Sequence, residues 1–272
     1  MVLDVLFIAV LGWGLIGAAA ATVTSQVVGG VIPLLYFLLP NKSPLRIVWP
    51  RMGLSESLRV IGKVTVNGSS ELMTNISMSV VSMLYNYQLM RLAGEDGIAA
   101  YGVMMYVSFV FIAVFIGFAI GSAPIVGFHY GAGNHSELKS LLRKSMVLTV
   151  LTGVGMAALS VALATPLSGI FVGYDEGLYA LTRRGFLLYS SSFLFAGFGI
   201  LGSSFFTALG NGVVSAAISF LRTLLFQVAA VLILPLLWGV DGIWLSVTAA
   251  ELLATAVTFL FLFGMRKKYR YM

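Results

Sequence analysis

Polar side chains recur at helical spacing within one apolar stretch of the sequence, residues 64–90. These positions hold amides, hydroxyls, one thioether and one carboxylate: Asn67, Glu71, Thr74, Asn75, Met78, Ser82 and Tyr85. Side chains three or four positions apart share one face of a helix. Such a face is costly against lipid, where polar groups find no partners. We therefore expect it to line a cavity or to meet a neighbouring helix.

Glu71 is the acidic residue of this face, and two interpretations apply to it. Ionisable residues inside membrane spans mark ion or proton pathways by default, and a carboxylate can hold a proton or pair with Na⁺. On this interpretation, which we favour, Glu71 binds the ion, and the amides of Asn67 and Asn75, one turn away on either side, shape its pocket. On the other, Glu71 is a buried, hydrogen-bonded glutamate that holds helices together.

The composition excludes a soluble protein. Hydrophobic residues make up 59% of the 272 residues and charged residues 10%, against about 25% charged in soluble domains, and the mean hydropathy is +1.00. The net charge of +6 comes from basic residues clustered between apolar segments, which is typical of membrane topology and not of nucleic-acid binding. The chain has no cysteine, no G-x-S-x-G or H-E-x-x-H motif, and no third ligand beside His129 and His135. We expect neither an enzyme nor a metal site.

Seven apolar stretches are long enough to span a bilayer: 16–39, 64–90, 98–127, 145–164, 185–208, 213–235 and 242–264. Basic residues are in excess in the connections 40–63 and 128–144 and in the tail 265–272. Because cytoplasmic loops of membrane proteins carry this excess, the sequence predicts a multi-pass protein with a cytoplasmic C-terminus. Residues 1–10 are long enough to cross only half a bilayer, so they are either the stub of a longer helix or an interfacial segment.

An internal repeat links the two ends of the sequence. Residues 11–26 align without gaps with residues 236–251, and the pairs Trp13/Trp238, Gly14/Gly239 and Gly17/Gly242 are shared. The plainer alternative is that apolar helices preceded by glycine align readily. As a repeat, it predicts one complete unit, roughly 40–272, preceded by the end of another. A protein of two such units would need on the order of 180 further residues upstream.

Two other features lie inside the predicted spans. Arg222 and Glu251 fall at the same depth on successive helices, about 14 Å into the membrane, so we expect a structural ion pair between them. Gly117, Gly121 and Pro124 are expected to break the span 98–127. Interrupted helices line cavities or bend in transporters, although close packing through small residues is an equal alternative.

Four segments in order carry a family resemblance: ELMTNISMSVVSMLYNYQL (71–89), GFAIGSAPIVGFHYGAGN (117–134), SSFFTALGN (203–211) and GVDGIWLSVTAAELL (239–253). With them the sequence resembles the bacterial branch of the multidrug and toxic compound extrusion (MATE) family. The resemblance implies twelve helices in two six-helix lobes around a central cavity. It also implies an antiporter of the bacterial cytoplasmic (inner) membrane that exports amphipathic organic cations, driven by H⁺ or Na⁺.

The resemblance also bears on individual residues. Glu71 matches the position of the family's coupling carboxylate. Some members carry a second acidic residue in the fifth helix of this lobe, but residues 186–206 contain none, which favours H⁺ over Na⁺. The residues that we expect to line the cavity are Thr74, Met78, Ser82, Tyr85, Ser192 and Phe193. No cofactor is expected beyond the coupling ion.

The predicted fold is an all-α integral membrane protein, a helical bundle with one six-helix lobe and the last helix or so of a preceding lobe. Residues 1–39 end the N-terminal lobe, with a helix stub at 1–10 and a helix at 16–39. Residues 40–63 are a cytoplasmic linker, 64–264 the C-terminal lobe, and 265–272 a basic cytoplasmic tail. The expected partners are organic cations, membrane lipids and the missing N-terminal lobe, in cis or as a separate chain. The alternatives are a flippase for lipid-linked or polysaccharide substrates and a non-transporting fragment or subunit.

Overall fold

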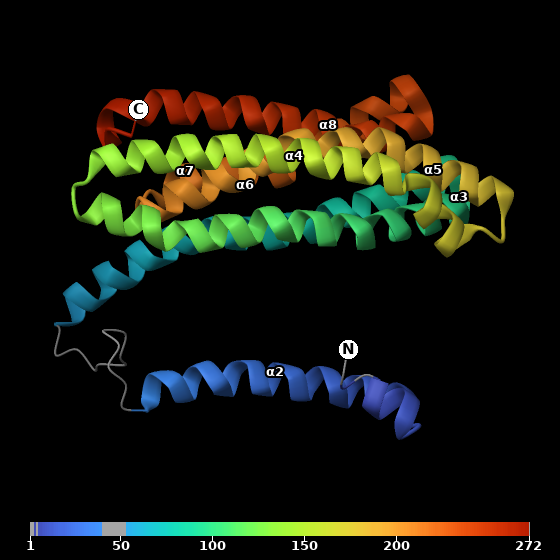
Figure 1. Ribbon diagram of the computed structural model, residues 1–272, viewed down its shortest axis with the longest axis horizontal. Coiled ribbons are helices and arrows are strands. Elements are labelled where there is room, and N and C mark those ends of the chain that lie inside the picture. Colours follow the sequence, from blue (N-terminus) through green and yellow to red (C-terminus); the bar gives the residue numbers. More distant parts are fainter. Residues whose placement is uncertain (1–2, 4, 40–52, 272) are drawn as a thin grey trace. The chain divides into compact units, whose positions relative to one another are not determined.

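The structure is a computed structural model that describes residue 3, residues 5–39 and residues 53–271. It divides into two units, Met1–Ser57 and Leu58–Met272, and each is considered by itself. Every regular element in the described part of the chain is a helix (Figure 1). This confirms the all-α class.

The first unit contains a short π-helix, η1 (Val5–Val10), and a long α-helix, α2 (Gly14–Leu38). The rings of Phe7 and Trp13 stack at 5.3 Å. Gly14 has a φ of 53°, and a Cβ on Gly17 would lie 2.8 Å from the backbone oxygen of Phe7. Both glycines are therefore needed to start α2 directly against η1. Residues 40–52 of the predicted linker lie outside the described residues.

The second unit consists of six helical arms joined by tight turns (Figure 1). The first two belong to α3 (Leu54–Gly131), which folds back at Gly94 (φ 64°, ψ −151°), and the third is α4 (His135–Val172). The fourth combines α5 (Glu176–Tyr189), η2 (Ser190–Ser192) and α6 (Phe193–Ala208). The last two comprise α7 (Gly212–Phe220), the π-helix η3 (Leu221–Leu225) and α8 (Phe226–Tyr269), which folds back at Gly239.

The glycines of the internal repeat have matching backbone roles. Gly239 has a φ of 54°, as Gly14 has 53°. A Cβ on Gly242 would lie 2.3 Å from the backbone oxygen of Leu234, just as one on Gly17 would meet the backbone of Phe7. In both places a left-handed glycine turns the chain, and the second glycine packs against the helix that comes before. The repeat therefore has a local structural counterpart.

Two apolar cores hold the second unit together. One includes Leu89, Tyr101 and Trp244, close to the turns at Gly94 and Gly239. The other includes Leu138 and Phe206, close to the turns between α3 and α4 and between α6 and α7. Since successive turns alternate between the two cores, the arms run back and forth between them.

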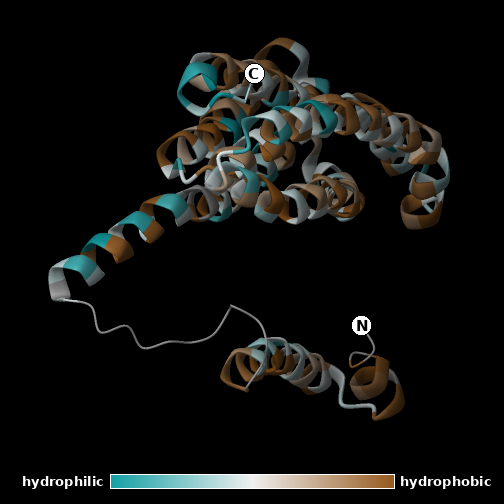
Figure 2. Ribbon diagram, turned by 60° about the vertical axis from the view of Figure 1, so that its left-hand side comes forward, coloured by the Kyte–Doolittle hydropathy of each residue, from teal (hydrophilic) through white to brown (hydrophobic). Residues whose placement is uncertain are grey.

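The outer surfaces are rich in exposed, large apolar side chains. Five helical segments of the described chain are long and apolar enough to cross a membrane. Figure 2 shows these arms largely in the hydrophobic colour, with hydrophilic residues at the start of α3. That helix begins at Leu54, so residues 54–63, expected in the linker, are already helical.

The predicted break at Gly117, Gly121 and Pro124 is wrong, because Gly94 is the residue of α3 with non-helical φ and ψ. Close packing does not explain the two glycines either, because a Cβ on Gly117 or Gly121 would meet nothing within 4 Å. Pro124 removes the donor to the carbonyl of Ile120, yet α3 continues through it without non-helical backbone angles. Here the Oγ atoms of Ser122 and of Ser204 on α6 both donate to the carbonyl of Ala119, at 3.1 Å each.

The end of the chain is packed against the second core. Helix α8 continues to Tyr269, and Arg270 adopts a left-handed conformation with a φ of 54°. Tyr271 then returns to the core, where it is fully buried and donates its hydroxyl to the carbonyl of Leu262 at 2.9 Å. The predicted basic tail is thus the last turn of a helix followed by an anchored tyrosine.

Candidate functional site

A cavity of about 730 Å³ lies within the second unit. Its wall is formed by both arms of α3 and by the segment from Tyr189 through α6, completed by residues of η3 and α8. Most of this wall is apolar. Small-molecule sites typically have volumes of about 300–1,000 Å³ and mostly apolar walls with a few polar groups. The cavity therefore has the size and character of a site for a drug-sized molecule.

The polar face of α3 borders this cavity over most of its length. The described lining residues include five of the seven that the sequence singles out: Asn67, Thr74, Met78, Ser82 and Tyr85. Asn75 is absent from the lining. Glu71 lies in the helical backbone of α3, but its side chain lies outside the described residues.

Asn67 occupies the end of the face nearest to α6. Its Nδ2 lies 3.5 Å from the carbonyl oxygen of Thr207. Its Oδ1 is buried and has no hydrogen-bond partner among the described residues. A buried amide oxygen of this kind is costly unless it meets a donor. It is thus available to a ligand group or a water molecule.

Tyr85 is fixed at the other end of the face. Its hydroxyl lies 2.9 Å from Oε1 of Gln227 and 2.5 Å from Oγ of Ser246, and its ring stacks on Tyr101 at 5.2 Å. Ser246 in turn donates to the carbonyl of Ile243 at 2.6 Å. Tyr85 therefore joins the two arms of α3 to α8 and gives the cavity a rigid aromatic corner.

Ser192 and Phe193 contribute to the cavity from the junction of η2 and α6. Both are almost fully buried. The ring of Phe193 lies 5.1 Å from that of Phe111 and 5.6 Å from that of Tyr189. Phe193 is therefore a member of the first core whose edge reaches the cavity, rather than a free aromatic surface.

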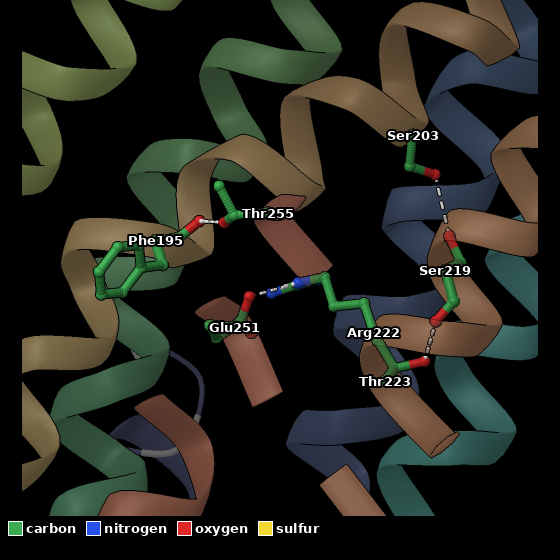
Figure 3. Close-up of polar contacts among 7 residues, drawn as sticks. All are labelled: Phe195, Ser203, Ser219, Arg222, Thr223, Glu251 and Thr255. Atoms are coloured by element: carbon green, nitrogen blue, oxygen red, sulfur yellow. Dashed lines mark hydrogen bonds and ion pairs between the residues drawn. The ribbon is translucent and has the colours of Figure 1, made fainter. Parts of the chain in front are cut away.

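Arg222 and Glu251 form an ion pair in the cavity wall (Figure 3). Nε of Arg222 donates to Oε2 of Glu251 at 2.8 Å, and the side chains are 13% and 6% exposed. Arg222 lies in the π-helix η3, an irregularity often found at functional sites. A Cβ on Gly199 would lie 2.5 Å from Cδ of Arg222, so a glycine leaves room for the arginine stem. The expected pairing occurs, and its position at the cavity was not foreseen.

Hydroxyl groups join α6 to α7 and η3 beside this pair, and the sequence analysis missed them. Oγ of Ser203 lies 2.8 Å from Oγ of Ser215 and 2.9 Å from Oγ of Ser219, and Oγ1 of Thr207 lies 2.6 Å from Oγ of Ser215. Thr223 donates to the carbonyl of Ser219 at 2.7 Å (Figure 3). The detectable signal was the i, i+4 spacing of these residues on both elements. Four of these residues, Ser203, Thr207, Ser219 and Thr223, line the cavity, and Ser215 is fully buried behind them.

Comparisons with known proteins agree with this architecture. The family model described as MatE matches residues 72–233. The probable multidrug resistance protein YoeA of Bacillus subtilis (strain 168) is 26% identical over 157 residues, which is 54% of this chain and 34% of that protein.

Two solved structures match all of the chain. One is a MATE protein in complex with MaL6, with a TM-score of 0.88 and 22% identity over 100% of this chain and 61% of that one. The other is an outward-facing multidrug resistance MATE family transporter of the MOP superfamily, with the same TM-score and identity over 100% and 60%. The chain thus spans about 60% of the length of these two structures. It belongs to the MatE family of membrane transporters.

Proposed function

We propose that this chain forms one lobe of an antiporter that exports amphipathic organic cations across the bacterial cytoplasmic membrane in exchange for H⁺ or Na⁺. The observation that carries the proposal is the cavity of about 730 Å³ with the polar face of α3 in its wall. Its apolar lining suits the body of an amphiphile, and aromatic rings such as that of Tyr101 suit a cation.

We assign the coupling ion to Glu71. Asn67 and Thr74, which lie four positions before and three positions after it on α3, both line the cavity. At this spacing Glu71 shares their face. A carboxylate at a cavity inside the membrane can exchange a proton or Na⁺ for a cationic substrate, because it cannot hold both at once. Asn67 supplies an amide at the cavity one turn before Glu71, and Asn75 lies one turn after it, outside the cavity lining.

The same proposal includes the orientation of the chain in the membrane and a partner lobe. Exposed basic residues gather at the start of α4 and the end of α8, where the second core joins these segments: Lys139, Arg143, Lys144, Arg266, Lys267 and Lys268. This excess supports a cytoplasmic position for that end of the lobe and for the C-terminus. A second lobe, in the same protein or as a separate chain, closes the cavity, since the solved relatives are longer than this chain.

The test is energised efflux of ethidium, an aromatic quaternary cation, from cells that express this lobe together with its partner lobe. We expect Glu71→Gln to abolish efflux at an unchanged protein level. The matched control is Glu95→Gln, which neutralises an exposed glutamate at the turn after Gly94 and should keep efflux intact. Undiminished efflux in Glu71→Gln would refute the coupling assignment.

A further inference from the structure

Among the described residues that line the cavity, the formal charges balance to zero. Among the described lining residues, Arg222 and Glu251 are the two that carry formal charges, and they pair with each other at 2.8 Å. The remaining described lining is apolar, or polar without charge. A ligand at this wall therefore meets a positive and a negative group side by side in surroundings of low dielectric.

The pair also has the capacity to bind a head group. The contact uses Nε of Arg222 and Oε2 of Glu251. A guanidinium carries two further nitrogens with donor hydrogens, and a carboxylate carries a second acceptor oxygen. Ser219 and Thr223, three positions before and one position after Arg222, also line the cavity, and Thr223 already donates its hydroxyl to the carbonyl of Ser219. The wall can thus offer donors to an anionic group and an acceptor to a cationic one.

Charge balance decides which head group suits this wall. A ligand with one positive charge is repelled by Arg222. To form a full ion pair with Glu251, it must displace Arg222 and leave that guanidinium unpaired. A ligand with one negative charge meets the same difficulty at Glu251. A buried charge without a partner is strongly unfavourable, whereas a paired charge recovers at least part of its desolvation cost. A ligand that carries both charges close together can lie beside the pair and leave neither residue unpaired.

We propose that the Arg222–Glu251 pair is a head-group subsite for amphipathic zwitterions, molecules with a cationic and an anionic group close together on an apolar body. The subsite rests on the proposed function, because it narrows the organic cations of that proposal to those that also carry an acidic group. The apolar wall holds the body of the molecule and the ion pair selects its head group.

Three fluorescent probes test this subsite with the full chain in phosphatidylglycerol nanodiscs. They share one dansyl-labelled alkyl chain and differ in the head group, which is trimethylammonium, sulfonate or sulfobetaine. We expect the sulfobetaine probe to bind about tenfold more tightly than either singly charged probe. The corresponding difference in binding free energy is a modest share of the cost of leaving a buried charge unpaired. The variant Arg222→Met/Glu251→Gln keeps the net charge and should reduce this preference to about twofold or less.

The outcomes separate the two proposals. Binding of the trimethylammonium probe with no preference for sulfobetaine overturns the subsite and leaves the proposed function standing. Failure of all three probes to bind overturns both. A preference that persists in the double variant also overturns the subsite. A zwitterionic phospholipid has the same head-group chemistry, so the assay is repeated with phosphatidylethanolamine. Competition by this lipid supports the subsite with a lipid as its occupant, and no competition supports an exported compound.

A second variant tests the subsite even if the double variant does not fold. Gly199→Ala keeps both charges and places a methyl group 2.5 Å from Cδ of Arg222, which forces the flexible arginine stem to move. Its matched control is Gly155→Ala, whose Cβ would meet nothing within 4 Å. We expect Gly199→Ala to lose the sulfobetaine preference and Gly155→Ala to keep it. Equal preference in both variants overturns the subsite.

Discussion

Neutralising one member of the Arg222–Glu251 pair should destabilise the fold far more than neutralising both. Glu251→Gln leaves the guanidinium of Arg222 without its partner at a largely buried site, where the side chain of Arg222 is 13% exposed and that of Glu251 is 6% exposed. Removing one partner of a buried pair costs about 3–5 kcal/mol, whereas replacing both by uncharged groups is often neutral. Because the pair borders a cavity that water can enter, we expect the lower end, about 3 kcal/mol.

The same reasoning applies to Arg222→Met, which leaves Glu251 unpaired. The double variant Arg222→Met/Glu251→Gln should cost about 1 kcal/mol or less. The coupling energy between the two sites is then about 3 kcal/mol, which is large for a pair of residues in contact.

Thermal unfolding in nanodiscs, followed by tryptophan fluorescence, measures this cycle. Trp244 is 1% exposed in the first core and therefore reports loss of tertiary packing. At about 2–4 °C per kcal/mol, each single variant should lower the melting temperature by about 6–12 °C. The double variant should recover most of that loss. Equal losses in the single and double variants would refute the ion-pair reasoning.

Three further variants test the packing of the second unit by the same measurement. Gly202→Ala places a methyl group 2.2 Å from a threonine methyl of α8 and should lower the free energy of unfolding by about 1–3 kcal/mol. Its control is Gly117→Ala, whose methyl group would meet nothing within 4 Å. Equal effects of the two variants would contradict the close packing at Gly202. Tyr271→Phe removes the hydrogen bond to a carbonyl of α8 and should cost about 1 kcal/mol, so an unchanged melting temperature would contradict the anchoring of the C-terminus. Arg184→Gln should leave the melting temperature unchanged, because Arg184 is 68% exposed and water screens its ion pair with Asp241; a large loss would show that this pair is structural.

The helical arms could be predicted from hydropathy, but their ends could not. The span expected at 145–164 is part of α4, which runs from His135 to Val172. Hydropathy detects the apolar centre of a helix, while the helix itself continues through charged residues outside the hydrocarbon. The start of α4 carried a local signal in Asn134, whose side chain accepts from the amide of Glu137 at 3.2 Å as an N-cap.

The positions of the sharp turns also could not be predicted from the composition of the sequence. Pro124 and its neighbouring glycines predicted a break, yet the chain folds back at Gly94, which lies between charged residues. A proline inside a membrane helix is tolerated when hydroxyls from neighbours compensate it. Near Pro124, Ser204 on α6, a helix far away in the sequence, donates its hydroxyl to the carbonyl of Ala119. Its contribution becomes visible only once the helices are assembled.

The polar face of α3 could be recognised because its residues follow one another at helical spacing. The groups that complete the cavity come from other elements, such as Gln227 and Ser246, which hold Tyr85. Depth in the membrane was enough to predict that Arg222 and Glu251 meet. It could not show that they meet at a cavity, because depth gives the position of a residue along its helix and not the side of the helix that faces a cavity.

The most direct test of the account is a count of the ions released when an organic cation binds. Calorimetric titration of the trimethylammonium probe into the protein, in buffers of different ionisation enthalpy and with and without Na⁺, gives this number. We expect binding to release about one H⁺ or Na⁺ and to weaken as the pH falls or as the Na⁺ concentration rises, because ion and substrate compete for Glu71. We also expect Glu71→Gln to lose this release. Full ion release in Glu71→Gln would contradict the assignment of Glu71 as the coupling site.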